Sequence, residues 1–261
     1  MGLRELDQIL RGQAIHTAAG QQQPTVSVVP LLATNLLLAA FYGVCMGIFG
    51  LSGRAEPEFR LMLADAFKVP LLFLLTLFVT FPSLYVFNAL VGSRLGVVDL
   101  ARLMTASLAV LLAVLAAFGP IVGFFSITTT NYPFILLLNV AVFVLAAIFG
   151  LSYLTRTFDS MLPRPIPVAR RVRNYDPEVQ ELPPEEAAAP AIESRSPPPS
   201  PGAARAVLRV WLVAFALVGA QMSWVLRPFI GWPGMEFTWF RPRESSFFEA
   251  VLKSLRMLFG G

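Results

Sequence analysis

Few side chains in this sequence could perform acid–base or nucleophilic chemistry. Histidine and cysteine occur once each, as His16 and Cys45, and His16 is far from any cluster of carboxylates. The sequence has no paired metal ligands, no GxSxG motif and no glycine-rich phosphate loop. Asp65, Lys68 and Asp99 fall at the ends of apolar stretches, where charged side chains are commonly solvated. We therefore expect a protein that is not an enzyme, with no catalytic residue and no cofactor or metal site.

Neutral polar residues and prolines are the groups left inside the apolar stretches. The candidates for helix packing or for lining a path are Asn35, Asn88, Asn139, Pro82, Pro120 and Gln221. In lipid, such polar groups bond across helices at roughly 0.6 to 2 kcal/mol each, which favours a role in packing. Prolines kink helices, and broken helices build binding sites in transporters, so a water-filled path is the alternative.

Membrane-spanning helices are the elements that would position these residues. Apolar residues make up 56% of the 261 positions and charged residues 14%, against about 45 to 50% and about 25% in a soluble domain. About 20 apolar residues in a helix cross a hydrocarbon core of about 30 Å. Stretches without charge predict five spans, at about 31–51, 69–93, 103–126, 133–155 and 210–226. The predicted fold class is an all-α membrane protein, a bundle of five transmembrane helices with amphipathic terminal helices.

The predicted spans form a group of four and a separate fifth. Residues 1–24 are predicted to be an amphipathic or cytoplasmic segment, in which Leu3, Leu6 and Leu10 share a helical stripe, and residues 25–156 form the four-helix unit. Residues 157–205 are rich in proline and charge, which predicts a disordered cytoplasmic linker. Residues 206–261 contain the fifth span, an aromatic interfacial loop and an amphipathic C-terminal helix.

The prolines at 197–201 of this linker fit a partner that recognises proline motifs, although a solvated tether is the simpler interpretation.

Arginines on both sides of the linker predict its location. Arg156 and Arg164 follow the fourth span closely and Arg209 precedes the fifth, and such cations accumulate on the cytoplasmic side. Counting crossings from a cytoplasmic linker places the N-terminus inside and the C-terminus outside. Cations after the fifth span, such as Arg227 and Lys253, oppose this assignment, so the side of the C-terminus stays open. The net charge of +4 is explained by topology and not by a nucleic-acid partner.

Two short repeats raise the possibility of an inverted repeat. The sequence IFGLS occurs at 48–52 and at 148–152, and both Pro82 and Pro133 are followed six positions later by asparagine. An inverted repeat with an offset of three spans would relate the first and fourth spans. A sixth span is missing, however, and a sequence dominated by Leu, Ala and Phe produces chance matches, so both explanations stay open.

A block near the C-terminus resembles a known group of proteins. Residues 222–231, MSWVLRPFIG, followed by Phe240, Arg241 and the acidic and aromatic 244–248, resemble a block of bacterial multi-span integral membrane proteins that lack an assigned function. The resemblance implies a bacterial inner-membrane protein and nothing about activity. Five spans with a cytoplasmic N-terminus are also loosely similar to Yip1-type proteins, although the AspLeuTyrGlyPro type of motif near their first span is absent here.

The function expected from these patterns is a membrane scaffold or accessory subunit that organises a membrane complex. Its partners would be the lipid bilayer and either a membrane protein or a second copy of the chain. The alternative is a small-solute channel or transporter with a neutral polar path near Asn88 and Asn139.

Overall fold

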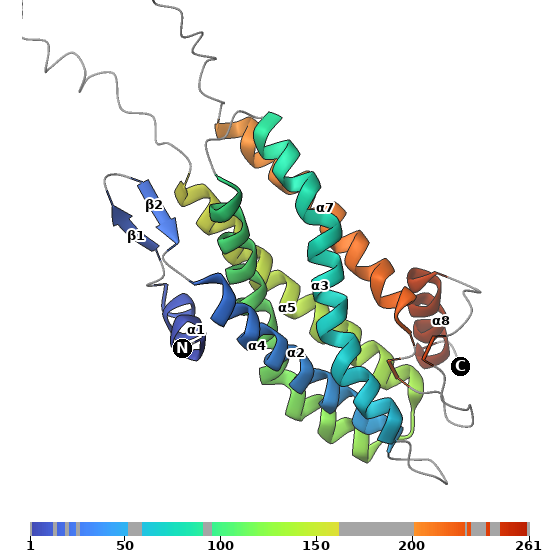
Figure 1. Ribbon diagram of the computed structural model, residues 1–261. Coiled ribbons are helices and arrows are strands. Elements are labelled where there is room, and N and C mark those ends of the chain that lie inside the picture. Colours follow the sequence, from blue (N-terminus) through green and yellow to red (C-terminus); the bar gives the residue numbers. More distant parts are fainter. Residues whose placement is uncertain are drawn as a thin grey trace, which may run out of the picture.

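The computed structural model describes residues 2–12, 15–18, 21–24, 27–51, 59–90, 96–161, 201–227, 229–230, 239–240 and 246–259. Figure 1 shows a bundle of long helices with a small hairpin beside it. The elements in chain order are α1 (Gly2–Leu10), β1 (Ile15–Ala18), β2 (Gln21–Pro24), α2 (Val28–Gly47), the 3-10 turn η1 (Ile48–Gly50), α3 (Phe59–Leu90), α4 (Val97–Thr128), α5 (Tyr132–Met161), α7 (Pro201–Val225) and α8 (Phe247–Phe259).

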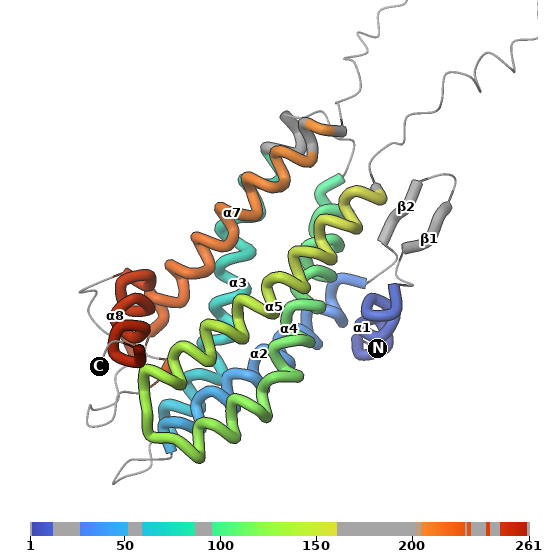
Figure 2. The backbone as a smooth tube through the Cα atoms, turned by 180° about the vertical axis from the view of Figure 1, so that it is seen from behind, coloured from blue at the N-terminus to red at the C-terminus, as the bar shows by residue number. Residues whose placement is uncertain are grey.

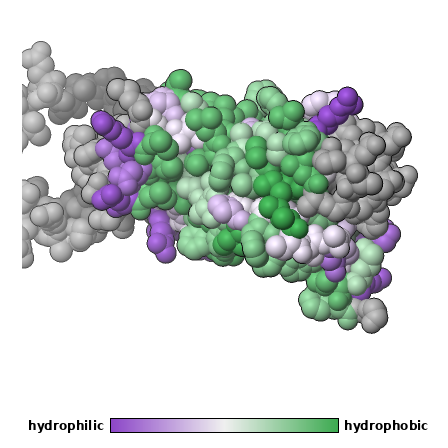
Figure 3. Space-filling model, turned by 90° about the horizontal axis from the view of Figure 1, so that it is seen from below, coloured by the Kyte–Doolittle hydropathy of each residue, from purple (hydrophilic) through white to green (hydrophobic). Residues whose placement is uncertain are grey.

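The five predicted spans and the helical fold class are confirmed. The helices α2 with η1, α3, α4, α5 and α7 are each long and apolar enough to cross a membrane, as in a multi-pass membrane protein. On the face seen in Figure 3, apolar residues cover the middle of the molecule and hydrophilic residues lie at both ends. Large apolar side chains such as Phe78, Phe124 and Val213 are more than half exposed along the spans, as a lipid-facing surface requires.

The helix α3 begins ten residues earlier than the predicted second span. Buried residues recur at helical spacing from Leu61 through Ala64, Asp65, Lys68 and Val69, so a continuous packing stripe holds this segment in the helix. The expectation that Asp65 and Lys68 are solvated at a span end is therefore wrong. Asp65 is 0% exposed and Lys68 is 3% exposed.

The four helices α2, α3, α4 and α5 form the central unit. The helix α2 packs against α3 on one side and α4 on the other, and α5 packs against α4. Their shared core includes Tyr42 of α2, Phe73 of α3, Leu112 of α4 and Val142 of α5. Pro82 lies within α3 and Pro120 within α4, and both helices continue through their proline.

The helix α7 packs on the outside of this unit, mainly against α3. We call the end of the bundle where α5 ends and α7 begins the linker end, and the opposite end the α8 end. At the linker end, Leu208 and Trp211 of α7 join a core cluster with residues of α3, α4 and α5. The indole nitrogen of Trp211 donates to the Thr80 carbonyl at 3.1 Å, and Arg205 pairs with Asp159 at 2.8 Å. These contacts fix the linker end of α7.

The terminal helices are amphipathic, as predicted, but the N-terminal stripe differs from the prediction. Leu6 and Ile9 of α1 are buried together with Gly2, which lies against Pro30 and Thr34 of α2, whereas Leu3 and Leu10 are exposed. Gly2 makes the close approach because it has no side chain. The hairpin β1–β2, whose register pairs Ile15 with Pro24, was not expected from the sequence.

Several predictions concern residues outside those described. These are the greater part of the linker, 162–200, with its proline motif at 197–199, and most of the aromatic loop, namely residues 228, 231–238 and 241–245.

Candidate functional site: a cavity between α5 and α7

A cavity of about 390 Å³ separates α7 from α5. Its walls come mainly from Leu72–Thr76 of α3, Tyr132–Leu151 of α5, Phe215–Trp224 of α7 and Phe247–Val251 of α8, with Met46 of α2, Leu111 of α4 and Arg227 beyond the end of α7. Phe229 and Ile230 complete it at the α8 end. The cavity is thus enclosed by helices on several sides and runs along the span.

Small residues on α7 explain why the space is open. Ala216, Gly219, Ala220 and Ser223 recur at helical spacing on the cavity side of α7. A Cβ atom at Gly219 would lie at an ordinary distance of 3.6 Å from Thr76 Cγ2, so α7 approaches α3 closely here. Because the side chains of α7 are small between Ala216 and Ser223, they leave a gap to α5 in this part of the span.

The cavity is elongated along the span. Its lining on α7 extends from Phe215 to Trp224, which corresponds to roughly 14 Å at about 1.5 Å per residue. The space therefore suits an extended chain that lies along the helices.

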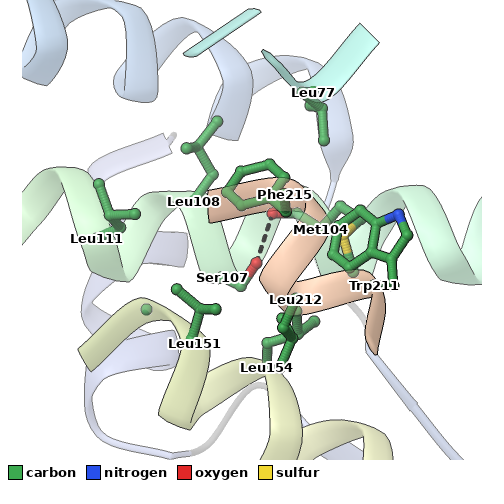
Figure 4. Close-up of a pocket in the computed structure, with 11 residues that line it drawn as sticks. Leu77, Met104, Ser107, Leu108, Leu111, Leu151, Leu154, Trp211, Leu212 and Phe215 are labelled. Atoms are coloured by element: carbon green, nitrogen blue, oxygen red, sulfur yellow. Dashed lines mark hydrogen bonds between the residues drawn. The ribbon is translucent and has the colours of Figure 1, made fainter. Parts of the chain in front are cut away.

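The end of the cavity nearest the linker end is closed by packed side chains (Figure 4). A small pocket of about 20 Å³ continues the cavity and shares Leu111, Leu151 and Phe215 with it. Trp211 and Leu212 of α7 close this pocket together with Met104 and Leu154. The hydroxyl of Ser107, which also lies in this wall, donates to the Met104 carbonyl at 2.9 Å.

The neutral polar groups in the cavity wall are satisfied by the protein itself. Thr76 donates to the Leu72 carbonyl at 2.7 Å, and Ser223 donates to the Ala220 carbonyl at 2.7 Å. Asn139 donates to the Ile135 carbonyl at 2.9 Å and accepts a hydrogen bond of 2.8 Å from the Tyr42 hydroxyl. Satisfied groups offer little to a polar solute, so these side chains leave the middle of the cavity apolar in character.

Two basic side chains lie at the α8 end of the cavity. Arg227 lines the cavity, and its guanidinium carbon lies 4.0 Å from the ring centroid of Trp224. Lys68 lies on α3 one turn before Leu72, which lines the cavity, and its Nζ is 5.8 Å from the ring centroid of Phe240. We call this end of the cavity the mouth.

Behind the mouth, α2 and α3 are in backbone contact around Asp65. A Cβ atom at Gly43 would overlap the Asp65 carbonyl, and one at Gly47 would lie 2.6 Å from Met62 Cα and 3.1 Å from Asp65 Oδ2. Neither carboxylate oxygen of Asp65 has a hydrogen-bond partner among the described residues. The glycines at 43 and 47 are a GxxxG pair, the spacing that allows close helix packing in membranes.

The structure does not bring the six sequence candidates together. Asn139 lines the cavity, whereas Asn35 donates to the Thr105 carbonyl at 3.1 Å and joins α2 to α4. Gln221 is exposed on α7. Pro82 and Pro120 lie inside α3 and α4, away from the cavity lining, and the side chain of Asn88 is outside the described residues.

Sequence reasoning missed the residues that shape this site. The stripe Ala216, Gly219, Ala220 and Ser223 is visible in the sequence, but small residues in spans usually mark tight packing and not an open space. From the sequence, Arg227 was interpreted only as a cation that bears on the side of the membrane on which the C-terminus lies. Its position at the end of an apolar helix, three residues after Trp224, was the available clue to an interfacial site.

Comparisons with known proteins identify no relative. No protein-family model matches the chain, and no curated protein and no solved structure does so either.

Proposed function

We propose that this protein is a non-enzymatic accessory subunit of a membrane complex that holds one lipid acyl chain in the cavity between α5 and α7. The observation that carries this proposal is the mainly apolar cavity of about 390 Å³ that runs along the span. Ligand pockets of about 300 to 1,000 Å³ with mainly apolar walls are typical of small-molecule sites. The occupant with the right shape and chemistry at this depth of a bilayer is a lipid tail.

The depth of the cavity supports an acyl chain as the occupant. The lining of roughly 14 Å along α7 is close to half of a hydrocarbon core of about 30 Å, the depth of one leaflet. A bound chain would fill the gap that the small residues of α7 leave.

The alternative of a small-solute path receives less support. A polar path needs groups that can replace the hydration of the solute. Asn35 instead donates to the Thr105 carbonyl, and Asn139 donates to the Ile135 carbonyl and accepts from the Tyr42 hydroxyl. The bonds to Thr105 and from Tyr42 join α2 to α4 and to α5, so they support the role of a packed subunit.

Filling the cavity should prevent lipid binding. Ala147 of α5 lines the cavity, and Ala141 of the same helix is exposed outside it. We expect Ala147→Phe to lower the fraction of protein carrying a dioleoylphosphatidylcholine adduct in native mass spectrometry about tenfold, the equivalent of about 1.4 kcal/mol. Ala141→Phe makes the same change on the lipid-facing surface and should leave the adduct unchanged. Equal adducts in wild type and Ala147→Phe would refute the proposal.

We further propose that the protein lies in a bacterial inner membrane with the N-terminus and the linker in the cytoplasm. The arginines at 156, 164 and 209 support a cytoplasmic linker end, and five spans then place α8 outside.

Single cysteines test this orientation. In a Cys45→Ala background, a membrane-impermeant maleimide should label positions 60, 129 and 250 in intact cells, but position 180 only after lysis. Labelling of 250 only after lysis would show that the C-terminus is cytoplasmic and would contradict the topology.

A further inference from the structure

The helix α7 has an outer face that the described part of the chain leaves uncovered. Only 11% of its apolar stretch is buried, against 28% to 50% in the other four spans. In Figure 1 and Figure 2 the helix lies at the edge of the bundle, and it packs mainly against α3. Its outer face therefore contacts either lipid or a partner in the membrane.

The exposed residues of this face have the spacing of a helix–helix seam. We call them the outer stripe, and they are Val210, Ala214, Leu217 and Gln221. They are separated by four, three and four positions, which is the spacing of a and d positions in a coiled coil. Gly219, which lines the cavity, is two positions from both Leu217 and Gln221 and so lies on the opposite side of the helix. The outer stripe is thus a separate surface from the cavity wall.

Gln221 is the residue of this stripe that contact with lipid does not explain. Its side chain is exposed, lies outside the cavity lining, and makes no hydrogen bond with the residues that the structure describes. Ser83, an exposed hydroxyl of α3, instead donates to the Thr80 carbonyl at 2.7 Å. An amide without a partner is costly in hydrocarbon, and polar side chains in spans commonly bond to another helix.

The depth of Gln221 keeps its amide away from the headgroups. The span Arg205–Val225 ends four residues later, which corresponds to roughly 6 Å at about 1.5 Å per residue. Side chains in a helix tilt toward its N-terminus, and α7 begins at the linker end. Gln221 therefore extends toward the middle of the bilayer and away from the nearer surface, so its partner has to lie within the membrane.

We propose that the outer stripe of α7 is the contact between two copies of this chain, in which the two Gln221 side chains bond to each other. All copies insert with the same orientation, so a two-fold axis along the membrane normal places equal residues at equal depth. An amide carries both a donor and an acceptor, so two glutamines that face each other satisfy both groups. Ala214, two turns earlier, is small enough for the helices to approach closely, and one polar a position fixes their register.

Energy transfer between donor-labelled and acceptor-labelled full-length protein in liposomes measures this pairing. We expect Gln221→Leu to raise the dissociation constant of the dimer about tenfold, the equivalent of about 1.4 kcal/mol. Gln221→Asn keeps an amide and should pair more tightly than Gln221→Leu. The control is Ser83→Ala, which removes an exposed polar group that bonds within its own helix, and it should leave the dissociation constant unchanged.

Cysteine crosslinking locates the contact. In a Cys45→Ala background, Leu217→Cys should form a disulfide between two copies when membranes are oxidised. Ile148→Cys places a thiol on an exposed position of α5 and should not form one.

The outcomes separate this inference from the acyl-chain site, on which it does not depend. A wild type that stays monomeric in liposomes, or equal pairing by wild type and Gln221→Leu, overturns it. Crosslinking of Leu217→Cys to a different membrane protein only also overturns it, because the stripe would then bind another partner. Gln221→Leu should keep the dioleoylphosphatidylcholine adduct of wild type, which shows that the variant is folded. Failure of Ala147→Phe to reduce that adduct overturns the proposed function and leaves the pairing of α7 intact.

Discussion

The Gly43→Ala variant is expected to lose about 2 kcal/mol of stability, although alanine is the better helix former. Gly43 of α2 is buried, and a Cβ atom there would overlap the carbonyl group of Asp65 and approach Ala66 Cα. These are backbone atoms of α3, so no side chain can move aside, and the two helices must separate. In lipid, helix association depends on such close packing because no hydrophobic force holds helices together.

The control for this variant is the same substitution at Gly219. A Cβ atom there meets Thr76 Cγ2 at 3.6 Å, which is ordinary contact, so Gly219→Ala should change stability by less than about 1 kcal/mol. Unfolding by SDS in mixed micelles measures both variants against wild type. Equal stability of the two alanine variants would contradict the backbone contact between α2 and α3.

Loss of the Lys68 charge should destabilise the bundle by about 3 kcal/mol, because it leaves Asp65 without its neighbouring cation inside the span. Asp65 is fully buried, and neither of its oxygens has a hydrogen-bond partner among the described residues. Lys68 lies one turn further along α3 and is also buried, so the two opposite charges interact across a low-dielectric interior. A buried carboxylate without a counter-charge is costly in lipid.

The substitution Lys68→Met tests this pair, and the double variant Asp65→Asn with Lys68→Met should recover at least half of the loss. Asp99 and Arg102 have the same spacing, but their side chains are 24% and 35% exposed and their shortest distance is 3.7 Å. Arg102→Met should therefore cost less than about 1 kcal/mol in the same unfolding assay. A Lys68→Met variant as stable as wild type would show that Asp65 does not need this charge.

The pair also shows where reasoning from the sequence reached its limit. The second span was predicted to begin at Val69 because this residue follows the last charge, and the prediction therefore left Asp65 and Lys68 outside the span. The helix instead follows the packing stripe that starts at Leu61, in which these two charges occupy buried positions. The helical period of that stripe and the glycine pair at 43 and 47 are visible in the sequence. The sequence does not show that the two features pack against each other, which is seen only in the contact between α2 and α3.

The sequence by itself determined the five spans, their approximate bounds and the amphipathic ends, because these depend on local length, hydropathy and helical period. The tertiary structure decided which helices touch. It placed α7 mainly against α3, with α5 touched near the linker end, and this arrangement leaves an apolar cavity between α5 and α7 with Arg227 at one end. In a bilayer, any apolar face of a helix can contact lipid tails as well as another helix, so composition does not determine which helices pack together. That choice follows from the fit of small and large side chains between helices.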